Sequence, residues 1–144
     1  MSANMPPLVA AGDAQEIDID AAATLAASVT DDGLPAAPGA VTTLWSVVSG
    51  PGNVTFTDET ALATDAQFDT AGTYVLQLAA DDGELQAQDE LTVVVRPPVV
   101  NQVPVVSAGD DQLIVMGGVA TLAGSVTDDG LPAAPGTVTT LWTA

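Results

Sequence analysis

The sequence contains no cysteine and no histidine, and Arg96 is its single basic residue. Without cysteine, no disulfide can stabilise the fold and no thiolate can bind a metal ion. The usual catalytic bases and nucleophiles are also missing, because histidine, cysteine and lysine supply most of them. The acidic residues fall in predicted turns and on exposed strand faces. We therefore expect a protein that is not an enzyme.

The formal net charge is −18 at pH 7 in a chain of 144 residues. This charge argues against nucleic acid as a partner, because binding to phosphate depends on lysine and arginine. It also disfavours docking on an anionic membrane surface. The apolar run Gln112–Thr127 is shorter than the ~20 residues that a spanning helix needs, and it contains Gly117-Gly118. We expect no direct membrane insertion.

One long block of sequence occurs twice. SVTDDGLPAAPG stands at Ser28–Gly39 and again, unchanged, at Ser125–Gly136, which is 97 residues later. VTTLW follows one position after each copy, at Val41–Trp45 and Val138–Trp142. Self-similarity at a fixed period indicates a tandem repeat. The period of 97 residues is close to the ~100 residues of an immunoglobulin-like sandwich.

Short alternating segments separated by turn signals fill the first unit. Gly72–Ala80 alternates clearly, and Asp81-Asp82-Gly83 turns it into Leu85–Val95, which predicts a β-hairpin. The other predicted strands are Leu8–Ala11, Glu16–Asp20, Ala22–Val29, Val41–Val48, Val54–Thr57 and Ala66–Phe68, the last two around a polar link at Asp58–Asp65. No segment keeps a helical period with caps. Seven or eight short strands predict an all-β sandwich.

The core of this sandwich is expected to be mostly aliphatic, since aromatic residues make up only 3% of the sequence. Trp45 lies on a mid-chain strand and Tyr74 begins a late one, as the core tryptophan and the tyrosine corner of such sandwiches do. Leu76 and Leu78 share the strand face of Tyr74. These four residues form the predicted structural core.

The sequence resembles a known family at several places. The run Ala71–Val95 looks like the closing hairpin of PKD (polycystic kidney disease) repeats, and the NxxP motifs at Asn4–Pro7 and Asn101–Pro104 are similar to those of PKD-like repeats in bacterial surface proteins. LWSVVSGPG at Leu44–Gly52 fits the same pattern, although it lacks the acid of the family's WDFGDG, and Thr30 stands where many members have aspartate. The resemblance implies an immunoglobulin-like, PKD-type β-sandwich repeat.

The resemblance also implies a function. PKD-type repeats act as non-enzymatic modules of secreted or cell-surface proteins, so we expect a stiff spacer or a building block of a filament or array, joined by end-to-end and strand-edge contacts. The expected location is extracellular or at the cell surface. The first residues, MSANMPPLVAAGD, show no signal peptide, so a signal is expected to lie outside this sequence.

Some PKD-like units bind calcium, which suggests an alternative role as a calcium-dependent adhesion or glycan-binding accessory module. Carried over by position, the candidate ligands are Asn4, Asp31 or Asp32, and Asp81 or Asp82, with a partial second site at Asn101, Asp128 and Asp129. Carboxylate and amide oxygens are suitable ligands for Ca²⁺. The alternative interpretation is that Asp-Asp-Gly is simply favourable turn chemistry.

The repeat period predicts the domain boundaries. Residues 1–98 hold one complete unit, and residues 99–144 hold the N-terminal half of a second unit. This half is expected to supply the first three strands of a sandwich and to expose apolar edges such as Leu113–Val115 and Trp142. Three explanations stay open: a slice of a longer tandem array, an arbitrary end, or completion by another chain. The expected partners are other copies of the chain or neighbouring repeats, in a homo-oligomer or filament.

Overall fold

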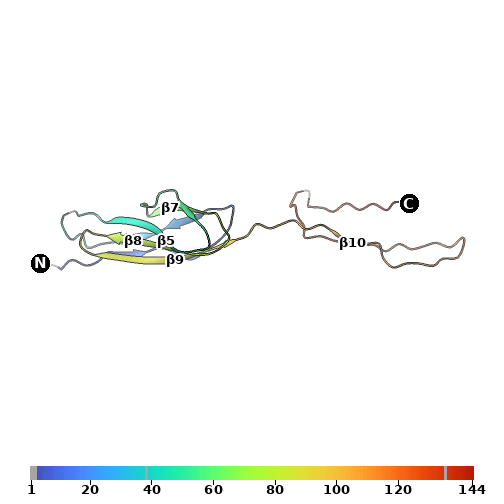
Figure 1. Cartoon of the computed structure of the whole chain (residues 1–144), viewed down its shortest axis with the longest axis horizontal. Helices are drawn as coiled ribbons and strands as arrows, with labels where there is room; N and C mark the ends of the chain where they lie inside the picture. Colours follow the sequence, from blue (N-terminus) through green and yellow to red (C-terminus); the bar gives the residue numbers. More distant parts are fainter. Residues whose placement is uncertain (1–2, 38, 135) are drawn as a thin grey trace. The chain divides into compact units, whose positions relative to one another are not determined.

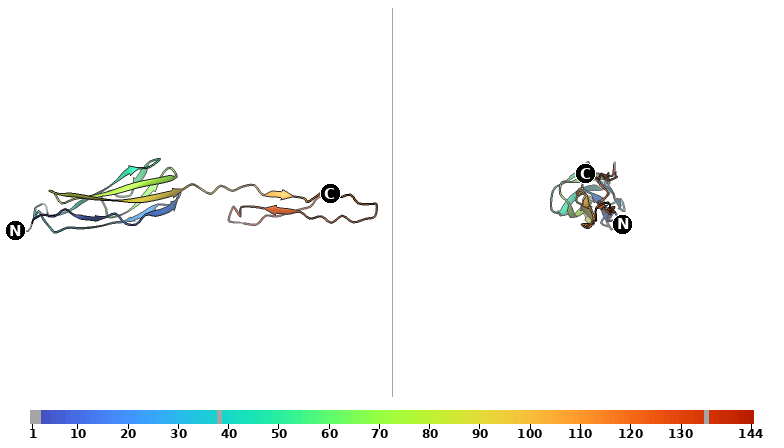
Figure 2. Two further views of the ribbon diagram at one scale, coloured as in Figure 1. Left: turned by 90° about the horizontal axis from the view of Figure 1, so that it is seen from below. Right: turned by 90° about the vertical axis from the view of Figure 1, so that its right-hand side faces the viewer.

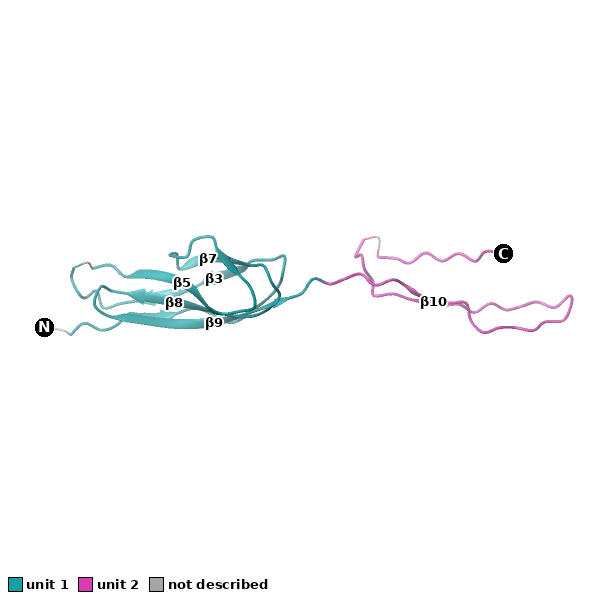
Figure 3. Ribbon diagram, viewed as in Figure 1, with its two compact units in different colours: residues 1–98 teal, residues 99–144 magenta. Residues whose placement is uncertain are grey.

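The computed structural model describes residues 3–37, 39–134 and 136–144. The chain divides into two compact units, Met1–Pro98 (unit 1) and Val99–Ala144 (unit 2), which are coloured separately in Figure 3. The described residues form strands and turns, and none of them belongs to a helix with the length and hydropathy of a membrane span.

Unit 1 is an all-β sandwich of short strands, as the sequence predicted (Figure 1). Its described strands are β1 (Leu8–Ala10), β2 (Gln15–Asp18), β3 (Ala23–Ala26), β4 (Ser28–Thr30), β5 (Thr42–Ser49), β6 (Val54–Phe56), β7 (Ala63–Phe68), β8 (Gly72–Asp81) and β9 (Gln86–Arg96). One sheet has the order β2-β9-β8-β5 and a second has the order β3-β7-β6, while β1 pairs with β4.

The β8–β9 hairpin holds the larger sheet together. The two strands pair in antiparallel register from Gly72 opposite Val95 to Asp81 opposite Gln86. Alternate residues of β8 are buried, because successive side chains of a strand point to opposite faces. Gly83 closes the turn with a positive φ of 101°, a conformation that side chains other than glycine rarely adopt.

The core lies between the two sheets. Trp45, Tyr74, Leu76 and Leu78 are each at most 2% exposed and pack with residues of β3, β7 and β9. The indole Nε1 of Trp45 donates a hydrogen bond to the Ala61 carbonyl at 3.0 Å, and the Tyr74 hydroxyl donates to the Thr70 carbonyl at 2.7 Å. Both large polar aromatics therefore have a partner for their polar atom, as burial requires.

Most predicted strand bounds differ from the structure by one or two residues, and two segments differ more. The predicted strand Ala22–Val29 is divided at Ala27, because β3 pairs with β7 while β4 pairs with β1. Ala27 lies between them and donates its N–H to the Leu62 carbonyl at 3.0 Å. The predicted polar link Asp58–Asp65 is shorter than expected, since β7 already begins at Ala63. Hydrophobic alternation does not show where a strand changes partners.

The two ends of unit 1 lie at opposite ends of the sandwich. Asn4 contacts the turn between β8 and β9 through Glu84, whereas the chain leaves the unit after Arg96 at the far end of β9 (Figure 2). A strand of 11 residues spans about 33 Å. Near this exit, β2 pairs with β9 in parallel, with Ile17 opposite Val95.

Unit 2 contains β10 (Val105–Ser107) and β11 (Ser125–Thr127), which pair in antiparallel register. They correspond to β1 and β4. The expected first three strands of a sandwich are therefore not all formed: within the described residues of unit 2, the segments matching β2, β3 and β5 have no strand assignment. Their partners in unit 1 are β9, β7 and β8, and unit 2 holds no equivalent of these strands.

Candidate functional site

The start of unit 1 meets two loops at one end of the sandwich. The side-chain amide of Asn4 donates a hydrogen bond to Glu84 Oε2 at 3.3 Å, and the Met5 backbone N–H donates to Asp32 Oδ2 at 3.2 Å. Asp32 follows β4, and Glu84 lies in the turn between β8 and β9. This end therefore gathers polar groups from three segments that lie far apart in the sequence.

Asp82 is the buried acid of this cluster, with only 2% of its surface exposed. Its Oδ1 accepts hydrogen bonds from the backbone N–H groups of Glu84 and Leu85, each at 2.8 Å. Its Oδ2 is buried and has no hydrogen-bond partner, and the same holds for Asn4 Oδ1. Buried acceptors without a donor are uncommon in folded proteins, so both oxygens call for an explanation.

The pKa of Asp82 is lowered from the ordinary value of 3.8. The Leu85 backbone N–H contributes most to this shift, burial opposes it, and the Glu84 N–H and the Asn4 side chain lower the pKa further. The Asp82 carboxylate is therefore ionised at neutral pH. Ionised carboxylate oxygens and amide oxygens are both suitable ligands for a hard cation such as Ca²⁺.

Asp31 and Asp81 take part in their own turns instead. Asp31 Oδ2 accepts from the Gly33 N–H at 2.9 Å, and Asp81 Oδ1 accepts from the Gly83 N–H at 2.7 Å. Asp81 Oδ2 also accepts from Gln86 Nε2 at 2.6 Å. Among the described residues, no three acidic side chains converge closely enough to hold a metal ion by themselves. The structure places Asn4 against Asp82 and Glu84 of the β8–β9 turn, and it links the neighbouring Met5 backbone to Asp32. Sequence reasoning had missed Glu84.

The partial second cluster repeats the first half of this arrangement. The Gln102 backbone N–H donates to Asp129 Oδ2 at 2.9 Å, as Met5 does to Asp32 in unit 1. Asp128 Oδ2 accepts from the Gly130 N–H at 3.3 Å in the local turn. Asn101 is exposed, and unit 2 has no hairpin turn that matches Asp82. A contact between the NxxP segment and the Asp-Asp-Gly loop therefore forms without the rest of the sandwich.

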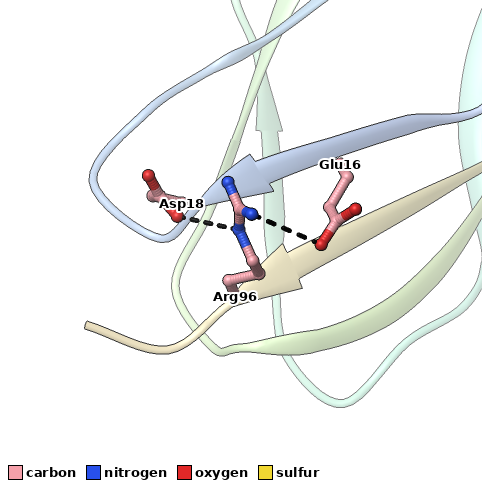
Figure 4. A network of polar contacts seen from close by, with 3 residues as sticks. All are labelled: Glu16, Asp18 and Arg96. Carbon is pink, nitrogen blue, oxygen red and sulfur yellow. Dashed lines mark hydrogen bonds and ion pairs between the residues drawn. The ribbon is translucent and has the colours of Figure 1, made fainter. Parts of the chain in front are cut away.

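A polar contact also marks the other end of unit 1. Arg96 Nε donates to Asp18 Oδ1 at 3.0 Å, and Arg96 Nη1 lies 3.5 Å from Glu16 Oε1 (Figure 4). These exposed contacts join the side chains of β2 and β9, which also pair through their backbones. In unit 2 the positions of Glu16 and Asp18 are taken by Leu113 and Val115, so this acidic pair is absent there.

Comparison with known proteins identifies the sandwich. The sequence model of the K319L-like PKD domain matches residues 11–95. The solved PKD domain from the KIAA 1837 protein is 25% identical with a TM-score of 0.51, and the match covers 67% of this chain and 93% of that one. The PKD domain from human KIAA0319 is 20% identical with a TM-score of 0.49, covering 64% and 82% of the two chains.

The Drosophila N-cadherin EC1-4 structure is 16% identical with a TM-score of 0.51, and the match covers 88% of this chain and 35% of that one. At this identity the likeness concerns the immunoglobulin-like fold alone. The family match spans more than half of the chain and runs from Ala11, before β2, to Val95 in β9. The chain therefore belongs to the K319L-like PKD domain family.

Proposed function

We propose that this chain is a non-enzymatic structural repeat of a secreted or cell-surface protein. It acts as a stiff spacer or as a building block of a filament or array, with other copies or neighbouring repeats as its partners. The observation that carries this proposal is the position of the two ends of unit 1. Asn4 lies at the β8–β9 turn and Arg96 at the far end of β9, about 33 Å away. Each added repeat would therefore lengthen a tandem array.

The strand pairing suits a repeat that bears tension. Because β2 and β9 are parallel, a force that separates the two ends of unit 1 slides one strand along the other. The backbone hydrogen bonds of the ladder are then loaded together rather than one after another. The linker to unit 2 begins with Pro97-Pro98, and proline-rich linkers hold neighbouring modules semi-rigidly.

Single-molecule pulling on the full chain, held by its two termini, tests this role. Unit 1 is expected to resist and then to unfold in one step that releases about 300 Å of chain, since an extended residue spans about 3.6 Å. Unit 2 should extend at low force, because among its described residues the strand pairing is the short one between β10 and β11. Smooth extension of the whole chain without a discrete step would contradict the spacer role.

A second candidate function, calcium-dependent adhesion, has one observation in its favour. Asn4 Oδ1 and Asp82 Oδ2 are buried acceptors without donors, and Asp82 is ionised at neutral pH. A Ca²⁺ ion bound by these two oxygens would satisfy both, with backbone carbonyls or water completing its coordination. Glycan binding has no comparable support, because Trp45, Phe68 and Tyr74 are buried in unit 1.

Thermal unfolding with and without calcium tests this second candidate. A ligand that binds only the folded state stabilises it by about 2.7 kcal/mol at a concentration of 100 times its Kd. We expect the Tm of unit 1 to rise with Ca²⁺ and the rise to be lost in Asp82→Asn, which keeps an oxygen for the turn. Asp31→Asn is the matched control and should keep the response. An equal Tm in Ca²⁺ and EDTA would exclude the site.

A further inference from the structure

The edge segment Gln112–Met116 of unit 2 differs from its counterpart β2 in the residues that protect a sheet edge. In unit 1, β2 is the outermost strand of its sheet and carries Glu16 and Asp18 on its exposed face. Charged residues on an outer strand oppose its pairing with a strand of another molecule. In unit 2 these two positions are Leu113 and Val115, which are both apolar.

The apolar side chains of this segment are exposed in unit 2 as the structure describes it. Leu113 is 101% exposed, Val115 is 81% exposed and Met116 is 105% exposed, while Ile114 is half-exposed. One contact of β2 is kept in unit 2: the Gln112 side chain bonds the backbone of Thr121, just as the Gln15 side chain bonds the Thr24 carbonyl in unit 1. The segment has no strand assignment in unit 2. In the extended conformation that β2 has in unit 1, it would present an uncharged edge, and such an edge is a template for strand addition.

Charge indicates which partner fits this edge. The chain carries a net charge of −18, so two copies repel each other wherever acidic faces meet. Between Asp111 and Asp128 the sequence has no charged residue. A second copy of the same segment therefore meets an uncharged, apolar surface here, and a two-fold axis brings identical surfaces together.

We infer that two copies of the chain associate through an antiparallel pairing of their Gln112–Met116 segments about a two-fold axis. With the axis at Ile114, Leu113 of each copy lies opposite Val115 of the other, and such apolar cross-strand pairs stabilise a sheet. A strand has two edges, so the pairing leaves one free for a β9-type strand. This pairing is one specific form of the self-association proposed above, and it rests on that proposed function.

Sedimentation velocity of the full chain in EDTA tests the pairing. The wild type should shift reversibly from monomer to dimer as its concentration rises. Leu113→Glu with Val115→Asp restores the residues of unit 1 and places four acids across the axis, so the dimer should dissociate at least about tenfold more readily. Both residues occur at the matching sites of folded unit 1. A far-UV circular dichroism spectrum equal to that of the wild type verifies that the variant keeps the conformation of both units.

The reciprocal variant provides a matched control. Glu16→Leu with Asp18→Val gives unit 1 the same apolar edge, so a chain with two such edges should form species larger than a dimer. A single Ile114→Cys substitution reports the register, because the protein has no other cysteine. It should form disulfide-linked dimers that disappear when Leu113→Glu and Val115→Asp are added.

Three results would overturn the inference. They are a wild-type chain that stays monomeric, an acidic variant that associates as strongly as the wild type, or dimers in which Ile114→Cys does not cross-link to itself. A mixture of Ile114→Cys and Val95→Cys chains tests a different occupant, since Ile17 lies opposite Val95 in unit 1. If only that mixed pair cross-links, the Gln112–Met116 segment is paired with β9 of another chain and not with a second copy of itself. The pulling experiment reports on unit 1, so the two proposals can fail separately.

Discussion

The same four residues, TTLW, form part of a strand in one half of the molecule and not in the other. Thr42–Trp45 lies in β5 and pairs with β8, whereas Thr139–Trp142 has no strand assignment. Trp45 is 2% exposed and Trp142 is 54% exposed. Since the local sequence is identical, the difference must come from what lies beside each segment.

Other elements behave alike in both units. β1 pairs with β4 through Val9 opposite Val29, and β10 pairs with β11 through Val106 opposite Val126, at positions that match in the repeat. Both members of this pair lie within the first half of the repeat. The comparison therefore separates strands that need only nearby residues from strands that need β7, β8 and β9.

The largest predicted effect concerns the two matched tryptophans, Trp45 and Trp142. Trp45→Ala removes a buried ring and its bond to the Ala61 carbonyl, so it should reduce the free energy of unfolding of unit 1 by about 3–5 kcal/mol. Trp142→Ala should change the free energy of unfolding of unit 1 by less than about 0.5 kcal/mol. Urea unfolding followed by circular dichroism measures both, and similar losses in the two variants would contradict the account.

A smaller effect is predicted at the tyrosine corner, which has no counterpart within unit 2. Tyr74→Phe keeps the ring against Phe68 but removes the hydroxyl that donates to the Thr70 carbonyl. The expected loss is about 1 kcal/mol in the free energy of unfolding, the usual contribution of one hydrogen bond. Stability equal to the wild type in urea would show that water replaces this bond without cost.

Acid should weaken unit 1 through the hairpin that unit 2 lacks. The folded-state pKa of Asp82 lies below 3.8, chiefly because of the Leu85 N–H, so its contribution is present above the unfolded pKa and is lost as pH falls through the folded pKa. The pKa values of Asp58 and Asp69 are lowered too, by Thr60 and by Asn53 respectively. Urea unfolding from about pH 7 down to about pH 2 should show this loss below about pH 4, less steeply in Asp82→Asn.

The smallest effect is predicted at Arg96. Arg96→Ala removes exposed ion pairs to Glu16 and Asp18, and such pairs contribute about 0–1 kcal/mol that salt screens. The difference in free energy of unfolding between variant and wild type should shrink from low to high ionic strength. A loss that is large and insensitive to salt would instead mean that the packing of the Arg96 chain holds β2 to β9.

Most of unit 1 could be predicted from its alternation and turns. The β8–β9 hairpin, the buried face of Tyr74 and the all-β class follow from residues close together in the sequence. The division of Ala22–Val29 could not be predicted, because it depends on β3 pairing with β7 and β4 pairing with β1. The sequence prediction expected more strands in unit 2 than the structure shows, for the same reason. Alternation indicates which face of a strand is buried, but it does not indicate which strand pairs with it.

The candidate site was predicted less well. The sequence placed Asn4 with two Asp-Asp-Gly turns, but it could not choose within each pair of aspartates. In the structure Asp81 bonds Gln86, while Asp82 is buried with a free Oδ2. Glu84 gave no signal, because its contact with Asn4 spans 80 positions. Calcium binding, self-association and the bacterial origin suggested by the motifs stay predictions.

The most direct test of the account supplies unit 2 with the strands that it lacks. Residues 48–98 are added a second time after Ala144, in a Trp45→Phe background, so that Trp142 is the only tryptophan. The account predicts that Trp142 becomes buried, with blue-shifted fluorescence and a cooperative unfolding transition, and that Leu78→Asp in the added copy abolishes both. Trp142 fluorescence that stays typical of a water-exposed indole would contradict the claim that unit 2 lacks only its partner strands.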